Sequence, residues 1–524
     1  MVSRYMFVFL LGVCAFADTS RGMEPKTVPL KEWPISDLEQ RIEQIDGKLA
    51  TLSHFTLRGG VGAIGYRSRH KRRNDIPLSV SVFWGTPRKI DQFVLVPVIR
   101  REQVNYYNAD GFPVAFSVYC GTTDPGSEIK VAEFSENSGL LPRIAPIVIP
   151  LDGIEASWLR IDTAQLSPDE YSSQRYILQL AEVLAYSGDR NVALHSQVTP
   201  ADDRTTNSSW NPGNLVDGFV PYLMDSASGD TSHAVISDLG GGNPATFTID
   251  LEGVYSIDGI QLHAPLLRDT IPYMFDSTFA IPRTLLIEGS LTPDFSDKKV
   301  LLFFKYDSAL DTGPIIVRNI VPKKCRYVRL VAKKPYYSSH NADPDRTRFG
   351  FAEVELFSGD ENVALGKPVS ANFGLDFSAE TPAPLTDGRN LYGNILPIRV
   401  WLNELALRHE LEKERPLVTA ELNRRYALQK QHLDWAIRLA IALAVAIVFG
   451  LLLERILRQR AIHKTRERIA ADIHDELGAN LHAIGLLGNL ARKLKDKPDE
   501  QDDILTRLQA MAKRSGLAAR YCTN

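Results

Sequence analysis

The sequence predicts a multidomain chain. We expect two all-β jelly-roll sandwiches, a helical stalk, one transmembrane helix, and a helical hairpin that forms a dimeric four-helix bundle. Three observations predict this layout. Blocks of short strands recur with a nearly constant spacing. The segment Trp435–Leu453 is almost entirely apolar. Beyond it, apolar residues return every three or four positions, as in a helix with one buried face.

Length, charge and the first residues limit the class of protein. A chain of 524 residues holds several domains, and its net charge of -3 is ordinary, so composition alone points to no partner. No direct nucleic-acid partner is expected. Arg4, the apolar run Met6–Phe16 and the small residues Ala15 and Ala17 predict a secretory signal peptide over 1–17. An uncleaved N-terminal anchor is the alternative interpretation.

Cysteine usage argues against a fold stabilised by disulfide bonds or by a structural metal. Cys120 and Cys325 lie in different predicted domains of the exported part, so we expect two buried free thiols rather than a disulfide framework. Val13 is too large to precede a lipidated Cys14. No Cys/His spacing suits a structural zinc site.

The apolar segment Trp435–Leu453 predicts a single membrane span. Leu439–Leu453 carries no polar side chain, and Arg438 at its outer end can extend toward the lipid headgroups. A buried core helix is the alternative, but the segment is apolar on every face. Basic residues follow at once and mark the cytoplasmic side; they are Arg455, Arg458, Arg460, Lys464, Arg466 and Arg468. Residues from about 18 to 434 are therefore expected outside the cell membrane, and residues from about 454 onward inside it.

The exported part is an internal repeat. Ala181–Leu194 returns as Ala352–Leu365, a shift of 171 residues in the numbering. Two further pairs of blocks recur at nearly the same distance, and each copy consists of short apolar or alternating runs between turn residues. These runs include Leu78–Phe83, Phe93–Val96, Ala245–Ile249 and Tyr327–Val331. Many short strands at such spacing predict a β-sandwich or jelly roll.

The second copy resembles discoidin domains, also called coagulation factor V/VIII type C or galactose-binding-like domains. The resemblance rests on blocks in the family order, which are Asn191–Leu194, Trp210, Asn214–Gly218, Phe247–Leu251, Ile257–Ile260, Arg326–Leu330 and Glu353–Leu356. It implies a jelly roll whose loops bind glycans, lipid headgroups or proteins. The first copy lacks the opening Asn-Val-Ala-Leu block, and its assignment rests on the repeat.

No ligand residue transfers by motif, so two groups of candidates stay open. The segment Gly62–Pro77 carries Arg67, Arg69, His70, Lys71, Arg72 and Arg73, which suits either an acidic polysaccharide or a solvated charged surface. Tyr66, Tyr106, Tyr107 and Trp210 suit either sugar stacking or ordinary packing.

Helices are expected on both sides of the sandwiches. Ser36–Glu39 matches a capping box that opens an N-terminal helix, whose apolar stripe is Leu38, Ile42, Ile45, Leu49 and Leu52. A third Asn-Val-Ala-Leu block begins at Asn362 without the strands that should follow. Pro397–His432 then predicts a charged helical stalk, broken at Pro416, that needs either the second sandwich or the same stalk of a second chain as its neighbour.

A helical hairpin is predicted after the span. The apolar seam Ile469, Ile473, Leu477, Leu481, Ile484 and Leu487/Leu490 leads to a turn over residues 495–500, and Ile504, Leu505, Leu508 and Met511 begin a second helix. Two such helices bury both seams only when a second chain completes a four-helix bundle.

His474 is the candidate reactive residue. It follows the seam residue Ile473 directly, so we expect it at the border of the seam and accessible. Asp475 can accept the proton of one ring nitrogen and leave the other as a nucleophile. A surface His-Asp pair without chemistry is the alternative for the dipeptide alone.

The surrounding motif resembles bacterial sensor histidine kinases. Arg468–Leu481, just inside a membrane helix, is similar to the dimerisation and phosphoacceptor segment of the nitrate-sensor and lipid-fluidity-sensor group. The resemblance implies that His474 accepts the γ-phosphoryl group of ATP and passes it to a response regulator, and that Asp475 orients and deprotonates it. Many members carry Gln five residues after the histidine; Ala479 stands there, so phosphatase activity is not implied.

The same resemblance implies ATP and magnesium, which need an ATP-binding domain. No Asn-box or Gly-rich ATP lid stands in the sequence, so we expect a phosphoacceptor rather than a self-sufficient kinase. A fragment or a frameshifted end is one explanation. The alternative function is a non-enzymatic, membrane-anchored glycan-binding or adhesion protein.

The expected divisions follow. They are the signal peptide at 1–17, helix and divergent discoidin-like sandwich at 35–187, second sandwich at 189–358, partial repeat and stalk at 362–434, transmembrane helix at 435–453, and dimerisation and phosphoacceptor helices at 455–524. The expected partners are a second copy of the chain, a response regulator, an extracytoplasmic ligand such as a glycan, and the bacterial inner membrane.

Overall fold

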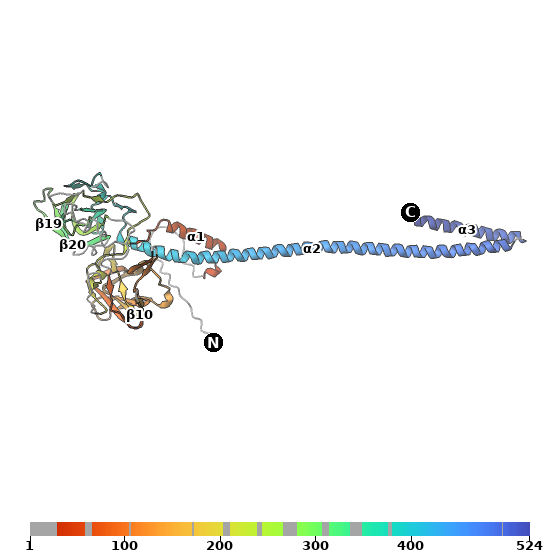
Figure 1. Cartoon of the computed structure of the whole chain (residues 1–524), viewed down its shortest axis with the longest axis horizontal. Helices are drawn as coiled ribbons and strands as arrows, with labels where there is room; N and C mark the ends of the chain where they lie inside the picture. Colours follow the sequence, from red (N-terminus) through yellow and green to blue (C-terminus); the bar gives the residue numbers. More distant parts are fainter. Residues whose placement is uncertain are drawn as a thin grey trace. The chain divides into compact units, whose positions relative to one another are not determined.

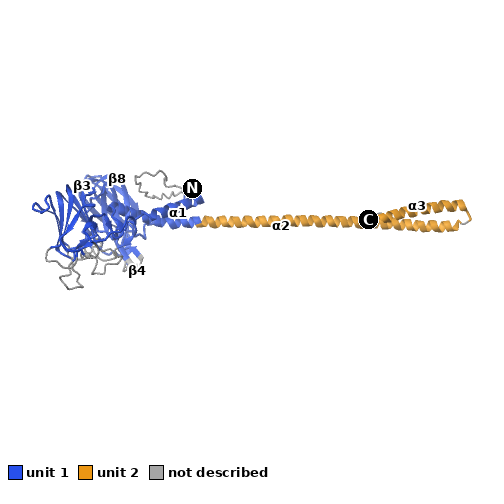
Figure 2. Cartoon of the chain, turned by 90° about the horizontal axis from the view of Figure 1, so that it is seen from above, with its two compact units in different colours: residues 1–422 blue, residues 423–524 orange. Residues whose placement is uncertain are grey.

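A computed structural model describes most of the chain. The described residues are 29–57, 65–103, 106–169, 172–202, 210–237, 244–265, 280–305, 314–335, 348–375, 380–494 and 496–523. The signal peptide expected at 1–17 lies outside them. The chain forms two compact units, residues 1–422 and 423–524 (Figure 2).

The first sandwich is built on a seven-stranded antiparallel sheet. Its order is β13-β12-β3-β8-β6-β7, with β14 pairing with β3. The strands are β3 (Leu78–Val96), β6 (Ala115–Gly121), β7 (Ile129–Phe134), β8 (Ile147–Gln165), β12 (Glu182–Ser187), β13 (Arg190–Asn191) and β14 (Gln197–Thr199). The register of β3 and β8 shifts between Phe83 and Arg88. Side chains from both sides of this shift, such as Val82 and Phe93, enter one buried cluster, so the sheet folds over a single core.

The second sandwich repeats this topology strand for strand. Its order is β19-β18-β20-β17-β22-β23, with β24 pairing with β17. The strands are β17 (Thr246–His263), β18 (Thr284–Ser290), β19 (Lys299–Lys305), β20 (Ile315–Lys334), β22 (Glu353–Ser358), β23 (Glu361–Asn362) and β24 (Val369–Ala371). A separate core that includes Phe247, Leu285 and Leu330 fills it. The predicted pair of all-β sandwiches is confirmed.

Short elements complete this unit. The remaining strands are β1 (Thr56–Leu57), β2 (Tyr66–Arg67), β4 (Ile99–Gln103), β5 (Tyr106–Ala109), β9 (Ser167–Asp169), β10 (Ser172–Ile177), β11 (Gln179–Leu180), β15 (Tyr222–Leu223), β16 (Val235–Ile236), β21 (Gly350–Phe351), β25 (Arg389–Asn390) and β26 (Gly393–Asn394). The 3-10 helices are η1 (Leu30–Glu32), η2 (Glu136–Ser138), η3 (Pro212–Leu215) and η4 (Ala383–Thr386).

The Asn-Val-Ala-Leu blocks complete the sandwich that precedes them. Asn191 Oδ1 accepts hydrogen bonds from the amides of Ala185 and Ala193, both at 3.1 Å. Asn362 does the same for Leu356 and Ala364, at 3.2 and 3.1 Å. The first sandwich therefore continues past residue 189, and the segment that begins at Asn362 is the last part of the second sandwich.

The N-terminal helix α1 (Ile35–Leu49) packs along α2 (Figure 1). Its predicted apolar stripe is confirmed, since Leu38 and Ile45 are fully buried. The predicted capping box is wrong: the helix begins one residue before Ser36, with Pro34 at the N-cap and no side-chain cap hydrogen bond. Pro34 lacks an amide proton, so the second half of a capping box has no donor.

A 96-residue helix, α2 (Ile398–Lys493), follows the sandwiches. Trp401, Leu402 and Leu405 are fully buried in a cluster with Val94 and Leu184 of the first sandwich. Further along, α2 packs on α1. One predicted neighbour, the second sandwich, contributes Ile315 of β20 to the same cluster as Trp401. The first sandwich and α1 are further neighbours, which sequence reasoning did not consider. The predicted break at Pro416 is wrong, because the helix continues through this residue.

Residues 423–524 form a unit of their own. By length and composition, α2 contains a segment that can cross a membrane, and Leu439, Leu443 and Phe449 in it are exposed. After the turn, α3 (Pro498–Thr523) forms the second arm of a hairpin with the end of α2 (Figure 1).

Candidate functional site

The end of α2 presents one apolar face toward α3. The residues of this face that lose solvent exposure recur mainly at intervals of three and four. They are Ile473, Leu477, Asn480, Ala483, Ile484, Leu487, Gly488, Ala491 and Leu494. This periodicity keeps one stripe of a helix facing its neighbour over several turns. The seam predicted from sequence is confirmed in part, because Ile469, Leu481 and Leu490 lie exposed instead.

Helix α3 supplies the matching face. Its half-buried or buried positions are Gln501, Ile504, Leu508, Met511, Ser515 and Ala518. At the closed end of the hairpin, Gln501 Nε2 donates to the carbonyl of Ala491 at 3.1 Å, and Lys497 pairs with Glu500 at 3.1 Å. The predicted helical hairpin is therefore present, and its second helix extends to Thr523.

His474 lies on the outer side of this seam. Its side chain is exposed, whereas the neighbouring Ile473 is half-buried. Asp475 is also exposed, as is Ala479. Adjacent residues of a helix point in directions about 100° apart, so their side chains do not face each other. No hydrogen bond joins His474 and Asp475 in this fully described part of α2, so the structure places the two residues together in the chain without pairing them.

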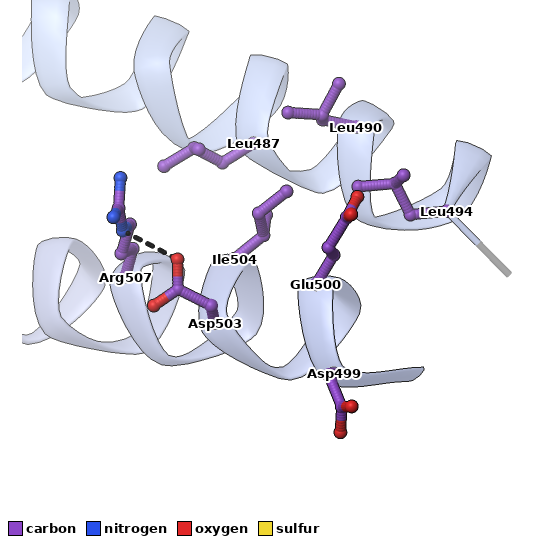
Figure 3. Close-up of a pocket in the computed structure, with 8 residues that line it drawn as sticks. All are labelled: Leu487, Leu490, Leu494, Asp499, Glu500, Asp503, Ile504 and Arg507. Atoms are coloured by element: carbon purple, nitrogen blue, oxygen red, sulfur yellow. Dashed lines mark ion pairs between the residues drawn. The ribbon is translucent and has the colours of Figure 1, made fainter. Parts of the chain in front are cut away.

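A shallow groove lies at the closed end of the hairpin (Figure 3). Leu487 and Ile504 lie between the two helices there. Three carboxylates line the groove, those of Asp499, Glu500 and Asp503, and Arg507 is paired with Asp503 at 3.2 Å. This charge disfavours a triphosphate. The groove residues therefore do not fit ATP. Nor do His, Cys, Asp and Glu gather into a metal-binding group anywhere in the described ranges.

The basic segment of the first sandwich is largely neutralised by its own acids. Arg67 and His70 both contact the buried carboxylate of Asp169 at 2.8 Å. Lys71 pairs with Asp202 at 3.0 Å, and Arg73 pairs with Asp75. Several of the cationic side chains are therefore held in ion pairs within the domain.

The aromatic candidates also pack internally. Tyr66 is buried, and its hydroxyl oxygen accepts from the amide of Ala201 at 3.1 Å. Trp210 lies under the guanidinium group of Arg67, with 5.4 Å between that group and the ring centroid. Tyr107 is half-buried against the cluster that contains Trp401. The side chain of Tyr106 lies outside the described residues.

Sequence reasoning missed a buried carboxyl group that both sandwiches share. Glu182 Oε1 accepts from the Gly218 amide at 2.9 Å, and Glu353 Oε1 accepts from the Gly388 amide at 3.0 Å. The φ angles of +85° and +74° at the two glycines favour residues without a side chain. Burial raises the pKa of Glu353 to about 10 and that of Glu182 well above its ordinary range. The repeated Glu-Val pairs at 182 and 353 were the available signal.

A second buried acid accompanies Glu182. Burial raises the pKa of Asp217 to about 7, while its hydrogen bond from the Phe219 amide at 2.9 Å acts in the opposite direction. These groups hold the turn after η3 against the first sandwich. Because the second sandwich repeats the Glu–Gly contact, we assign it to folding rather than to chemistry.

Comparison with known proteins supports the assignment of the hairpin. Residues 465–520 match the family model described as histidine kinase. This confirms the predicted resemblance to the dimerisation and phosphoacceptor segment of that family. No curated protein matches the chain.

Solved structures that align with the chain include the following two. The CBM32-1 and CBM32-2 domains of Clostridium perfringens ZmpB align at 11% identity, over 61% of this chain and 96% of that one, with a TM-score of 0.19. A fucolectin from striped bass (Morone saxatilis) serum aligns at 11% identity over 60% and 98%, with a TM-score of 0.18. The two-sandwich architecture itself rests on the strand pairing of this chain.

Proposed function

We propose that this protein is a membrane-bound sensor histidine kinase component of a two-component system. The observation that carries the proposal is the position of His474. It is exposed on a helical hairpin whose residues 465–520 match the histidine kinase family. An exposed imidazole beside a half-buried seam can be reached by another domain while its backbone stays fixed by the seam.

The proposed chemistry is nucleophilic. One ring nitrogen of His474 forms a bond to the γ-phosphorus of ATP as the bond to the ADP oxygen breaks. Asp475 is proposed to accept the proton of the other ring nitrogen, which requires a rotamer that brings its carboxylate to the ring. The phosphoryl group then passes to an aspartate of a response regulator.

ATP and magnesium need a site that the hairpin does not provide. The acidic groove at its closed end does not suit a triphosphate, so we propose that a separate ATP-binding domain presents the nucleotide to His474.

A second copy of the chain is the proposed partner of the hairpin. Large apolar side chains remain exposed on both arms, and they include Ile469, Leu481 and Leu490 of α2 and Leu505 and Leu517 of α3. Two helices leave such surfaces open, whereas a four-helix bundle of two hairpins buries them. We therefore propose a homodimer formed through the cytoplasmic helices.

The sandwiches are the proposed sensor. The apolar segment of α2 is long enough for one membrane span. We propose that this span lies in the bacterial inner membrane with the hairpin on its cytoplasmic side, because basic residues follow the segment directly. We propose that the sandwiches bind an extracytoplasmic ligand, such as a glycan. Tyr66 is buried, so we do not propose it as a binding residue.

The experiment supplies the full chain in lipid nanodiscs with the ATP-binding domain of a similar histidine kinase and [γ-32P]ATP. We expect an acid-labile, base-stable phosphate on the chain. His474→Gln should remove the label, whereas His482→Gln, an exposed histidine on the same helix, should keep it. Equal labelling of the two variants would refute the assignment of His474.

A further inference from the structure

Helix α2 has a weak point at Pro416. Proline has no amide proton, so the carbonyl of Glu412 lacks its helical donor, and the ring crowds the preceding turn. Close by, the hydroxyl group of Thr419 donates to the carbonyl of Arg415 at 2.8 Å. Side-chain bonds of this kind often bend helices. Two local features therefore favour bending in the same turn.

Helix α1 covers this turn on its apolar side. Leu411 lies before Pro416, and Val418 and Leu422 lie after it; all three are buried in a cluster with α1. On the facing side of the cluster, Leu38 and Ile45 of α1 and Leu52 just after it are buried. The partly buried residues around them include Ile35, Ile42 and Leu49. The contact thus extends across the proline rather than ending at it.

Ion pairs fix α1 next to the proline. Arg41 donates two hydrogen bonds to Glu414, both at 2.7 Å, and Arg415 donates two to Asp46, at 2.6 and 3.2 Å. Both partners on α2 directly precede Pro416. Two-point pairs of this geometry restrict rotation as well as separation of the helices.

A third contact holds the end of α1. The guanidinium group of Arg408 donates to the carbonyls of Leu49 and Leu52 at 3.0 and 3.2 Å. These carbonyls belong to the last turn of α1 and the segment after it, where helical donors are missing. Helix α1 is therefore attached to α2 both at its end and over the weak point.

We propose that α1 is a splint over a proline hinge in α2. With α1 docked, the helix passes through Pro416 unbroken; with α1 released, the turn around Pro416 opens and the helix bends there. The hinge lies on the N-terminal side of the apolar segment 435–453. Its use as a control point for His474 rests on the proposed function, whereas the hinge itself does not.

The test measures amide hydrogen exchange of the full chain in nanodiscs, on peptides that cover residues 409–422. Arg41→Ala with Asp46→Ala should speed exchange of these amides by about three- to tenfold. In a Pro416→Ala background, the same two substitutions should change exchange by less than about twofold, since the turn no longer depends on the splint. Arg41→Glu with Glu414→Arg should restore slow exchange.

Two outcomes would overturn the proposal. One is no increase in exchange on removal of the ion pairs. The other is an equal increase with and without Pro416, which would make α1 an ordinary packing partner. Peptides of β17 and β20 report whether the variants stay folded. If these peptides exchange faster, Arg41→Gln alone replaces the double substitution. It must then speed exchange of residues 409–422 when Pro416 is present and have little effect in the Pro416→Ala background. Phosphate labelling at His474 is a separate measurement. If the labelling fails, the proposed function is refuted, but the exchange experiment still decides whether Pro416 is a hinge.

Discussion

The two units of this chain handle apolar side chains in opposite ways. In residues 1–422, large side chains such as Phe247, Trp401 and Tyr66 are buried within the chain itself. Among the described residues beyond 422, only Ala491 and Ser515 are buried, while leucines and isoleucines remain exposed on both arms of the hairpin. The first unit carries its own core, whereas the second depends on surroundings such as a membrane or another chain.

The largest expected difference between the units follows from core truncation. The Phe247 ring lies 4.9 Å from that of Phe349 and 5.0 Å from that of Phe373, between ring centroids. Phe247→Ala should lower the unfolding free energy of the second sandwich by about 3–5 kcal/mol. Leu481→Ala should change it by less than about 0.5 kcal/mol, because this side chain is exposed in the other unit.

Thermal unfolding and hydrogen exchange of β17 and β20 measure both variants. Leu481→Ala should instead weaken self-association of the chain, as read by sedimentation in detergent. Comparable losses of sandwich stability in the two variants would contradict the contrast between the units.

The next effect concerns the buried carboxyl group of Glu353. Because burial raises its pKa in the folded state to about 10, the folded protein keeps a proton that the unfolded chain releases. The unfolding free energy of the second sandwich should therefore fall as pH rises toward that pKa. Between pH 6 and 9 we expect a loss of about 4 kcal/mol, because unfolding releases this proton throughout that range.

Glu353→Gln cannot ionise and should flatten this dependence, while its side-chain oxygen can still accept from the Gly388 amide. The melting temperature of the second sandwich at several pH values measures the slope. Glu361→Gln, an exposed substitution on β23, is the matched control and should retain the wild-type slope. An unchanged slope in Glu353→Gln would rule out the neutral buried acid.

A smaller effect tests where one sandwich ends and the next begins. Asn362→Ala removes the acceptor of two backbone amides and should destabilise the second sandwich by about 1–2 kcal/mol. Asn191→Ala should act equally, but on the first sandwich, although residue 191 follows the sequence boundary at 189. Hydrogen exchange of β12 and β22 separates the two. Destabilisation of β22 by Asn191→Ala would reverse our assignment of the blocks.

The smallest effect is expected in the second unit. Arg458 pairs with Glu454 one helical turn away at 2.6 Å, and both side chains are largely exposed. Arg458→Ala should change helix stability by at most about 0.5 kcal/mol. Circular dichroism during thermal unfolding checks this value. A larger loss would show that this pair is buried in the assembled protein.

The sequence predicted the length of the repeat but not where one copy ends and the next begins. The matching segments Ala181–Leu194 and Ala352–Leu365 each contain the last hairpin of a sheet and the Asn-Val-Ala-Leu block. The match is equally good whether the block is taken as the end of one sandwich or as the start of the next. Only the pairing of β14 with β3, and of β24 with β17, assigns each block to the preceding sheet. Such pairings join residues more than 100 positions apart, which local patterns do not reveal.

The helices were predicted well in kind and less well in detail. The 3.6-residue pattern gave the hairpin and the exposed position of His474, because burial of Ile473 fixes its neighbour's direction. The expected break at Pro416 did not occur: contacts with α1 on both sides of the proline offset the lost hydrogen bond. Pairing between His474 and Asp475 depends on rotamers, which a sequence pattern does not determine.

The cysteines described in the two sandwiches offer a separate consequence. Cys120 lies in β6 of the first sandwich and Cys325 in β20 of the second, and both are buried and unpaired. Burial raises the pKa of each thiol to about 11, so alkylating reagents meet little thiolate while a sandwich stays closed. The rate at which each thiol is alkylated therefore reports how often its own sandwich opens. Mass spectrometry after a brief alkylation pulse would measure the alkylated fraction of Cys120 and of Cys325 in one sample.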